Sequence, residues 1–266
     1  MRIYRAKDRS EESVSFASEH ILNMGEFYMN KGLSGSTLKI IAMVTMLIDH
    51  IGAAVLARMI IAGNADLYDA YRTLRMIGRI AFPIFCFLLI EGFQHTKNAK
   101  KYAERLFLFA AISEIPFDLA FSAKVLEFQY QNVFFTLAIG LVTIMAYKKV
   151  EESPISNSVL KLILQLAVGL AGGCIAEVLG TDYGMLGVMV LVVFYMLRAN
   201  RFYQIAAGCM LFIDNITALL AFIPVAFYDG RRGLNVKWLF YVFYPAHLLV
   251  LYGICYMMGL AHISVV

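Results

Sequence analysis

The chain has 266 residues, of which 61% are hydrophobic and only 16% are charged, and its mean hydropathy is +0.70. Soluble domains contain about 45–50% apolar and about 25% charged residues, so this composition excludes a soluble globular protein and indicates a polytopic membrane protein. The net charge of +4 does not indicate nucleic-acid binding, because the basic residues lie in short connectors between apolar runs. The cysteines have neither metal-ligand nor redox spacing, and no metal site is predicted.

The apolar runs predict an all-α bundle of about nine membrane spans at residues 34–266, after a polar cytoplasmic arm at residues 1–33. A charged loop is expected between the first two spans, with Asp66, Asp69, Arg72 and Arg75. The spans are expected at about 36–62, 76–94, 102–122, 131–148, 159–179 and 183–198, then within 201–230, and at 236–259.

The stretch 201–230 is basic at both ends and is interrupted at Asp214-Asn215, which favours two short spans or a re-entrant pair over one helix. Counted in this way, the connectors rich in Lys and Arg all fall on one side, which the positive-inside rule makes the cytoplasm. The N-terminus is therefore expected inside and the C-terminus outside. The opposite loops contain few basic residues, and Arg72 and Arg75 are the exceptions.

The first span contains Lys39, Asp49 and His50 within the apolar run 38–57. A charged side chain at mid-membrane costs at least about 2.5–3.5 kcal/mol, so such residues face the protein interior and mark function. Lys39 and His50 share a helix face and are separated by roughly 16 Å along the axis. Neighbours on a helix point about 100° apart, so Asp49 is expected to pair with another helix rather than with His50.

Other ionisable residues reach a similar depth: His247 in the last span, Glu114 in the third, and Arg79 within GRIAFPIF. Together with His50 they predict a polar cavity lined by the first, second, third and last spans. Histidine is the side chain suited to proton transfer near neutral pH. The alternative for each residue is structural, as a hydrogen-bonded core residue or, for Arg79, as a clamp on acidic partners.

The segment YDGRRG, Tyr228 to Gly233, predicts a glycine-rich turn with two arginines on the cytoplasmic side. Backbone N–H groups and guanidinium groups suit phosphate, and the alternative is ordinary positive-inside charge. The residues of this predicted phosphate-binding set are Lys39, Tyr228, Gly230, Arg231, Arg232 and Lys237. In the last span, Pro245 is expected to kink the helix just before His247.

The sequence resembles the TraX family of bacterial integral membrane proteins. The matching segments are LKIIAMVTMLIDHIGA (38–53), GRIAFPIFCFLLIEGF (78–93), SEIPFDLAF (113–121), QNVFFTLAIGL (131–141), YDGRRG (228–233) and FYVFYPAHLLVL (240–251). Members from conjugative plasmids are associated with N-terminal acetylation of the pilin subunit. The Lys39–His50 spacing and the Gly-Arg-x-x-Phe-Pro segment are also similar to the acyltransferase-3 type of membrane acyltransferase.

The resemblance implies an acetyltransferase of the bacterial cytoplasmic membrane, with cytoplasmic acetyl-CoA as donor and an unidentified amine or hydroxyl as acceptor. His50 is expected to act as general base, with Asp49 or Glu114 fixing its tautomer, or to form an acetyl-histidine intermediate. Arg79 or Asn132 is expected to stabilise the oxyanion or hold the acceptor. The expected catalytic set is His50, Asp49, His247, Glu114, Arg79 and Asn132.

Two other classes of function fit the sequence. In a proton-coupled transporter or exporter, His50, Glu114 and His247 would relay protons, but YDGRRG would have no role. The other class is a membrane scaffold for a secretion or conjugation machine. Binding of acetyl-CoA is expected of the enzyme and of neither alternative, so it distinguishes the enzyme from the other two functions.

Overall fold

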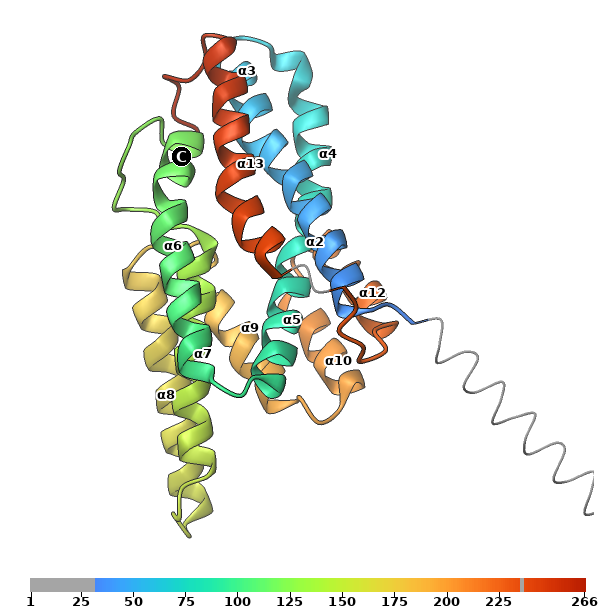
Figure 1. Cartoon of the computed structure of the whole chain (residues 1–266), viewed down its shortest axis with the longest axis vertical. Helices are drawn as coiled ribbons and strands as arrows, with labels where there is room; N and C mark the ends of the chain where they lie inside the picture. The colour runs from blue at the N-terminus through green and yellow to red at the C-terminus, as the bar shows by residue number, and fades with distance from the viewer. Residues whose placement is uncertain (1–31, 235–236) are drawn as a thin grey trace, which may run out of the picture.

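The computed structural model describes residues 32–234 and 237–266, which form helices and no β-strand (Figure 1). The all-α prediction is confirmed for these residues, whereas the predicted polar arm at 1–33 lies almost wholly outside them. The helices are α2 (Gly35–His50), η1 (a π-helix, Ile51–Leu56), α3 (Ala57–Ile61), η2 (Ala65–Leu67), α4 (Tyr68–Gly78), α5 (Ala81–His95), α6 (Ala99–Phe121), α7 (Val133–Glu151), α8 (Ser158–Val178), α9 (Gly184–Met196), α10 (Arg201–Leu211), α11 (Ile216–Leu219), α12 (Phe222–Ala226) and α13 (Lys237–Met257).

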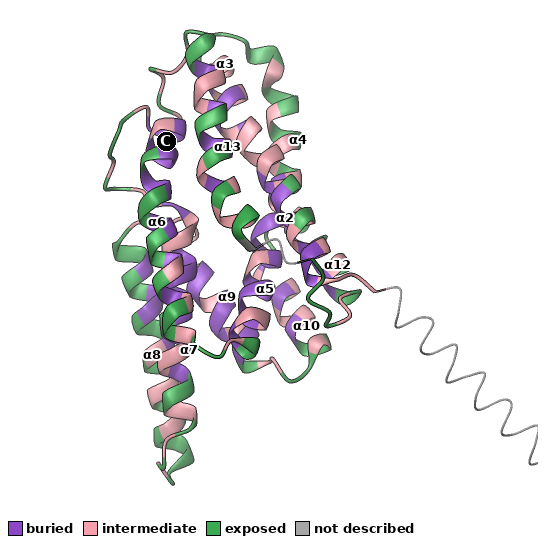
Figure 2. Ribbon diagram, in the orientation of Figure 1, coloured by how far each residue is buried: buried purple, intermediate pink, exposed green. Residues whose placement is uncertain are grey.

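Within the described part of the chain, five helical segments are long and apolar enough to cross a membrane: Gly35–Ile61, Ala65–His95, Val133–Glu151, Ser158–Val178 and Trp238–Met257. Figure 2 shows buried residues concentrated around α5 and α9, and long exposed stretches on α8 and α13. The exposed side chains of α8 are largely apolar, as expected of a surface that faces lipid. The chain is therefore a helical membrane protein.

Figure 1 shows α2, α4 and α13 side by side at one end of the molecule and α7, α8 and α9 at the other. Helix α6 joins the two groups, because it packs on both α13 and α7. Helix α5 packs on both α2 and α9. The ionisable residues described below lie where these two groups of helices meet.

The loop predicted between the first two spans is wrong, because residues 68–78 form α4, which packs on α2 and η1. Helix α4 is amphipathic, and its apolar face carries Leu74 and Ile77. Its charged residues lower the mean hydropathy of the segment, so the sequence pattern resembles that of a loop. Helix α5 follows after a break of only two residues, Arg79 and Ile80. Pro83 explains the break, because it has no N–H for the carbonyl of Arg79 and its ring crowds that carbonyl.

The chain reverses direction at Asp214-Asn215 as predicted, since α10 packs back against α12. Helix α10 has 11 residues. It is therefore only about 16 Å long, whereas the hydrocarbon core of a bilayer is about 30 Å thick. These lengths favour the re-entrant pair over two complete spans.

Arg58 is fully buried and holds the C-terminal end of α6. Its guanidinium donates to the carbonyls of Leu119 (3.2 Å) and Ala120, which belong to the last turn of α6. Its Nε–H donates to the carbonyl of Ile263 (2.8 Å) in the C-terminal segment. Carbonyls in the last turn of a helix lack intrahelical donors and favour a positive charge, so Arg58 caps α6.

Substituting Arg58 with Met should destabilise the protein on the order of 3 kcal/mol, because buried carbonyls of α6 lose their donors. The measurement is the thermal unfolding midpoint of the purified protein in detergent. Lys149→Met removes a positive charge from an exposed position on α7 and is the matched control. Equal unfolding midpoints for the two variants would contradict the capping role.

Candidate active site

His50 and His247 form a hydrogen-bonded pair between α2 and α13. The Nδ1 of His50 lies 2.7 Å from the Nε2 of His247. The ring planes differ by only 4° and the ring centroids are 5.0 Å apart, so the rings meet edge to edge in one plane. The sequence predicted a similar depth for the two residues, and the fold brings them into direct contact.

The second nitrogen of His247 fixes the tautomers of both rings. The Nδ1 of His247 lies 2.7 Å from the carbonyl oxygen of Phe243, which can only accept, so Nδ1 carries a proton. In the neutral ring Nε2 is then the acceptor, and the Nδ1 of His50 must donate to it. The Nε2 of neutral His50 therefore carries a lone pair, and it has no hydrogen-bond partner among the described residues. Its position suits a general base.

Aromatic rings enclose the pair. Phe121 and Tyr244 meet the ring of His50 edge to face, with centroids 5.4 and 6.1 Å away. Phe243 stacks on His247 at 4.7 Å. His247 is buried and His50 is half-buried, so the aromatic rings hold the pair in place.

The expectation that Asp49 or Glu114 fixes the tautomer of His50 is wrong, because His247 makes that hydrogen bond. The prediction that Asp49 pairs with another helix is confirmed: its carboxylate forms an ion pair with Arg75 of α4. Asp49 also lies within electrostatic reach of Arg79. Consecutive residues of α2 thus contact different helices, as the rotation of about 100° per residue requires.

Gly78 allows α4 to approach Asp49. A Cβ atom at this position would lie 2.1 Å from the Cβ and 2.2 Å from the Oδ1 of Asp49. Any larger residue would push α4 away from α2. The glycine of GRIAFPIF thus permits the approach of Arg75 and Arg79 to Asp49.

Asp182, which lies between α8 and α9 and was not predicted as a site residue, joins this group. The Tyr130 hydroxyl donates to its Oδ1 (2.8 Å), and the Thr136 hydroxyl donates to its backbone carbonyl. Arg79 lies within electrostatic reach of Asp182 and of the Tyr183 hydroxyl. The signal in the sequence was a single acidic residue between two apolar runs, without the spacing that would identify its partners.

Glu114 and Asn132 form a separate contact between α6 and α7. The Asn132 amide nitrogen donates to Glu114 and to the carbonyl of Ala110 (2.8 Å), and its oxygen accepts from the N–H of Phe134 (3.0 Å). Asn132 therefore uses its whole amide to cap α7 and hold it against α6. Glu114 retains one buried carboxylate oxygen without a hydrogen-bond partner among the described residues.

One pocket lies beside α4, which belongs to the second spanning segment, and the cavity predicted among the first, second, third and last spans stays a prediction. This pocket of about 270 Å³ is lined by Tyr71, Arg72, Arg75, Met76, Arg79, Asn215 and Thr217. It therefore belongs to α4 and the turn before α11, and not to the third and last spans. Helix α13 continues through Pro245 to Met257 as a single helix.

YDGRRG pairs with the residues that lead into α2. The N–H groups of Gly35 and Ser36 donate to the carbonyls of Arg231 (2.8 Å) and Arg232 (3.0 Å). Gly233 has a φ of +71°, and a Cβ there would lie 2.1 Å from the hydroxyl of Ser36. The start of the helix that carries Lys39 and His50 is thus fixed by the glycine-rich turn.

Several members of the predicted phosphate-binding set already have contacts. Arg231 forms an ion pair with Asp229 (2.6 Å), and its hydrogen bonds hold the pKa of Asp229 below the usual range. Lys39 lies over the ring of Phe240, 5.0 Å from its centroid. The backbone carbonyl of Tyr228 accepts from Arg201 (2.7 Å). Gly230 is exposed in the turn, Arg232 is exposed, and the side chain of Lys237 lies outside the described part.

Comparison with known proteins gives one family and one relative. The family model described as "TraX protein" matches residues 34–255. A protein from Dichelobacter nodosus described as "Probable fimbrial assembly protein FimC, serogroup H1" is 32% identical over 252 residues, which cover 84% of this chain and 96% of the relative. No solved structure matches the chain.

Substituting Gly78 with Ala should destabilise the protein by about 1–3 kcal/mol, because the new methyl group overlaps Asp49. The measurement is again the thermal unfolding midpoint in detergent. Gly253→Ala in α13 is the matched control, since nothing lies within 4 Å of a Cβ there. A Gly78→Ala variant as stable as Gly253→Ala would show that α4 does not need this close approach.

Proposed function

Because the chain belongs to the TraX family, we propose that it is an acetyl-CoA-dependent acetyltransferase of the bacterial cytoplasmic membrane. The acceptor is an amine or a hydroxyl group. The observation that carries the proposal is the His50–His247 pair, which leaves a lone pair on the Nε2 of His50. A general base with this geometry is what acyl transfer to an amine or hydroxyl requires.

In the proposed reaction, the Nε2 of His50 accepts the proton of the acceptor as its nitrogen or oxygen bonds to the acetyl carbon. The thioester C–S bond of the donor breaks, and the same proton then passes from His50 to the departing thiolate. His247 stabilises the imidazolium through its Nε2 lone pair, while its own Nδ1–H stays bound to the Phe243 carbonyl. Arg79 stabilises the oxyanion, and Asp49 positions Arg75 and Arg79.

The residues at the start of α2 fit the phosphates of the donor. Lys39 and Arg232 supply positive charge near the N-terminus of α2. Lys39 and His50 lie on one uninterrupted α-helix, so their axial separation is roughly 16 Å. An extended thiol-terminated arm bound at Lys39 would therefore run along α2 toward His50.

We assign the basic connectors to the cytoplasm and the C-terminus to the opposite side, in a bundle of about nine membrane-inserted segments that include the re-entrant pair. The donor then enters from the cytoplasm and the acceptor from the outer side. The description of the Dichelobacter nodosus relative suggests a fimbrial component as the first acceptor to test. Glu114 and Asn132 are assigned a positioning role, because they hold α7 on α6.

Substituting His50 with Ala should reduce acetyl transfer on the order of 10²–10⁴-fold, because the reaction loses its general base. The measurement is incorporation of label from radioactive acetyl-CoA into candidate acceptors by purified protein in nanodiscs. Thermal stabilisation by acetyl-CoA should persist in the variant, since the donor phosphates bind elsewhere. Full activity of His50→Ala would refute the mechanism, and no stabilisation of the unaltered protein by millimolar acetyl-CoA would favour a transporter.

Substituting His247 with Phe should lower kcat on the order of 10²-fold and leave the KM for acetyl-CoA unchanged, because His50 loses the acceptor that fixes its tautomer. Gln at the same position offers an oxygen to His50 and an N–H to the Phe243 carbonyl, so His247→Gln should restore most of kcat. The pH dependence of kcat should also shift in His247→Phe. Equal activity of the two variants would show that His247 only fills space.

A further inference from the structure

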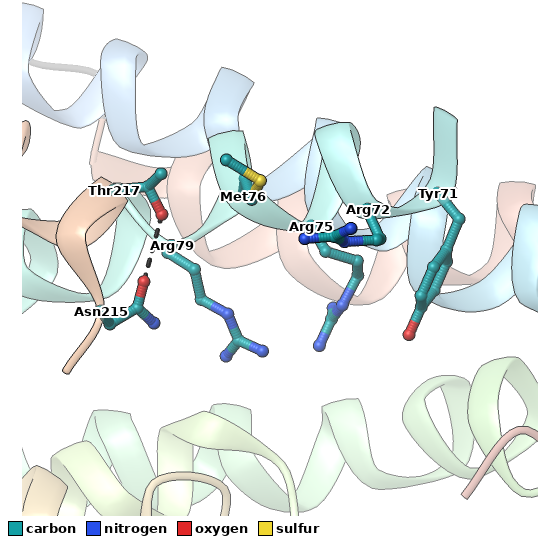
Figure 3. A pocket seen from close by; sticks show the side chains of 7 residues that line it. All are labelled: Tyr71, Arg72, Arg75, Met76, Arg79, Asn215 and Thr217. Atoms are coloured by element: carbon teal, nitrogen blue, oxygen red, sulfur yellow. Dashed lines mark hydrogen bonds between the residues drawn. The ribbon is translucent and has the colours of Figure 1, made fainter. Parts of the chain in front are cut away.

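A row of arginines lines one side of α4, apart from the His50–His247 pair. Arg72, Arg75 and Arg79 follow each other at spacings of three and four residues, which places them on the same face of the helix path. Figure 3 shows them between Tyr71 at one end and Asn215 with Thr217 at the other. We call this space the arginine pocket, and its volume is about 270 Å³.

The arginine pocket offers donors and little to repel an anion. None of the seven residues that line it is acidic. The Thr217 hydroxyl donates to the Oδ1 of Asn215 (3.1 Å), so the NH₂ group of Asn215 remains as the part that can bind a ligand. Guanidinium donors along the row and an amide donor at one end suit an anion whose oxygens point in several directions.

The arginines differ in how far they are neutralised. Arg75 pairs with Asp49 through one terminal nitrogen, and Arg79 lies near Asp49 and Asp182. Arg72 is exposed and makes no hydrogen bond or ion pair with any described residue. Three arginines thus share two carboxylates, which leaves a net positive charge centred on Arg72.

The positive charge of the arginine pocket is not explained by the positive-inside rule. In the orientation proposed above, α4 begins on the outer side, where the other loops contain few basic residues. The rule that places Lys and Arg on the cytoplasmic side therefore does not explain Arg72 and Arg75. Arg75, which lines the pocket, forms an ion pair with Asp49, and Asp49 directly precedes His50, so an anion bound in the pocket would lie on the acceptor side of the site.

We propose that the arginine pocket binds a phosphate group on the acceptor side, either a phosphate ester of the acceptor itself or the headgroup of an anionic phospholipid beside it. A tetrahedral phosphate can accept from the guanidinium groups of α4 and from Asn215 at once, whereas a carboxylate has only two coplanar oxygens. The volume equals about nine water molecules at roughly 30 Å³ each, which accommodates a phosphate group. The assignment to the acceptor side rests on the proposed function, while phosphate binding itself does not.

The experiment measures phosphate binding without acetyl-CoA, by equilibrium dialysis of labelled inorganic phosphate against purified protein in neutral detergent. Arg72→Gln should weaken binding about tenfold, the effect of losing one charge-assisted contact, and should fold normally because Arg72 has no structural partner. Lys149→Gln removes an equal charge from exposed α7 and should bind like the unaltered protein. Absence of phosphate binding, or equal binding by Arg72→Gln and Lys149→Gln, would overturn the proposal.

A second arm identifies the source of the phosphate. Nanodiscs of phosphatidylcholine with phosphatidic acid should displace inorganic phosphate if the pocket holds a lipid headgroup, whereas only soluble phosphate esters should displace it if the acceptor carries the phosphate. Displacement by acetate as effective as by either phosphate compound would overturn the choice of phosphate. If phosphate binding depends on Arg72 but the protein has no acetyl-transfer activity, the proposed function is refuted and the proposed phosphate site is retained. If the protein transfers acetyl groups but does not bind phosphate, the proposed phosphate site is refuted and the proposed function is retained.

Discussion

The site depends on the two consecutive residues at the end of α2, which tie this helix to neighbours on different sides. Asp49 forms an ion pair with Arg75 of α4, and His50 hydrogen-bonds to His247 of α13. Both partners are held in turn, Arg75 by the close approach at Gly78 and His247 by the carbonyl of Phe243. A shift of α2 by one residue would break both contacts at once, so the register of this helix is fixed by its polar residues.

The segment that follows His50 supports this register. Ile51–Leu56 is a π-helix, a rare conformation that recurs at functional sites because its wide turn changes which residues face a neighbour. After it, Arg58 points into the last turn of α6 and the C-terminal segment. The spanning helix thus makes polar contacts with α4, α13 and α6 in succession, and the apolar residues between them pack the bundle.

The sequence predicted the elements that depend on local pattern, which include the all-helical fold, the reversal at Asp214-Asn215 and the pairing of Asp49 with another helix. It placed His50 and His247 at similar depth, because helical rise converts residue counts to distance. It did not predict α4, because the charged face of this helix lowers its average hydropathy to that of a loop. The contacts of Arg58, Asp182 and Tyr130 depend on which helices become neighbours, and spacing in one chain does not contain that information.

The polar groups are distributed so that the two ends of α2 face different chemistry. Its N-terminal end carries Lys39 and lies against the glycine-rich turn, where the proposed function places a phosphate-bearing donor from the cytoplasm. Its C-terminal end lies between the histidine pair and the arginine pocket, and in the proposed orientation this is the outer half. Positive charge thus lies near both ends of α2, from Lys39 of α2 itself at one end and from Arg72 and Arg75 of the neighbouring α4 at the other. In the acetyltransferase proposed above, the donor and an acceptor-side phosphate would approach His50 from these two ends without sharing a site, whereas a proton relay requires neither positively charged group.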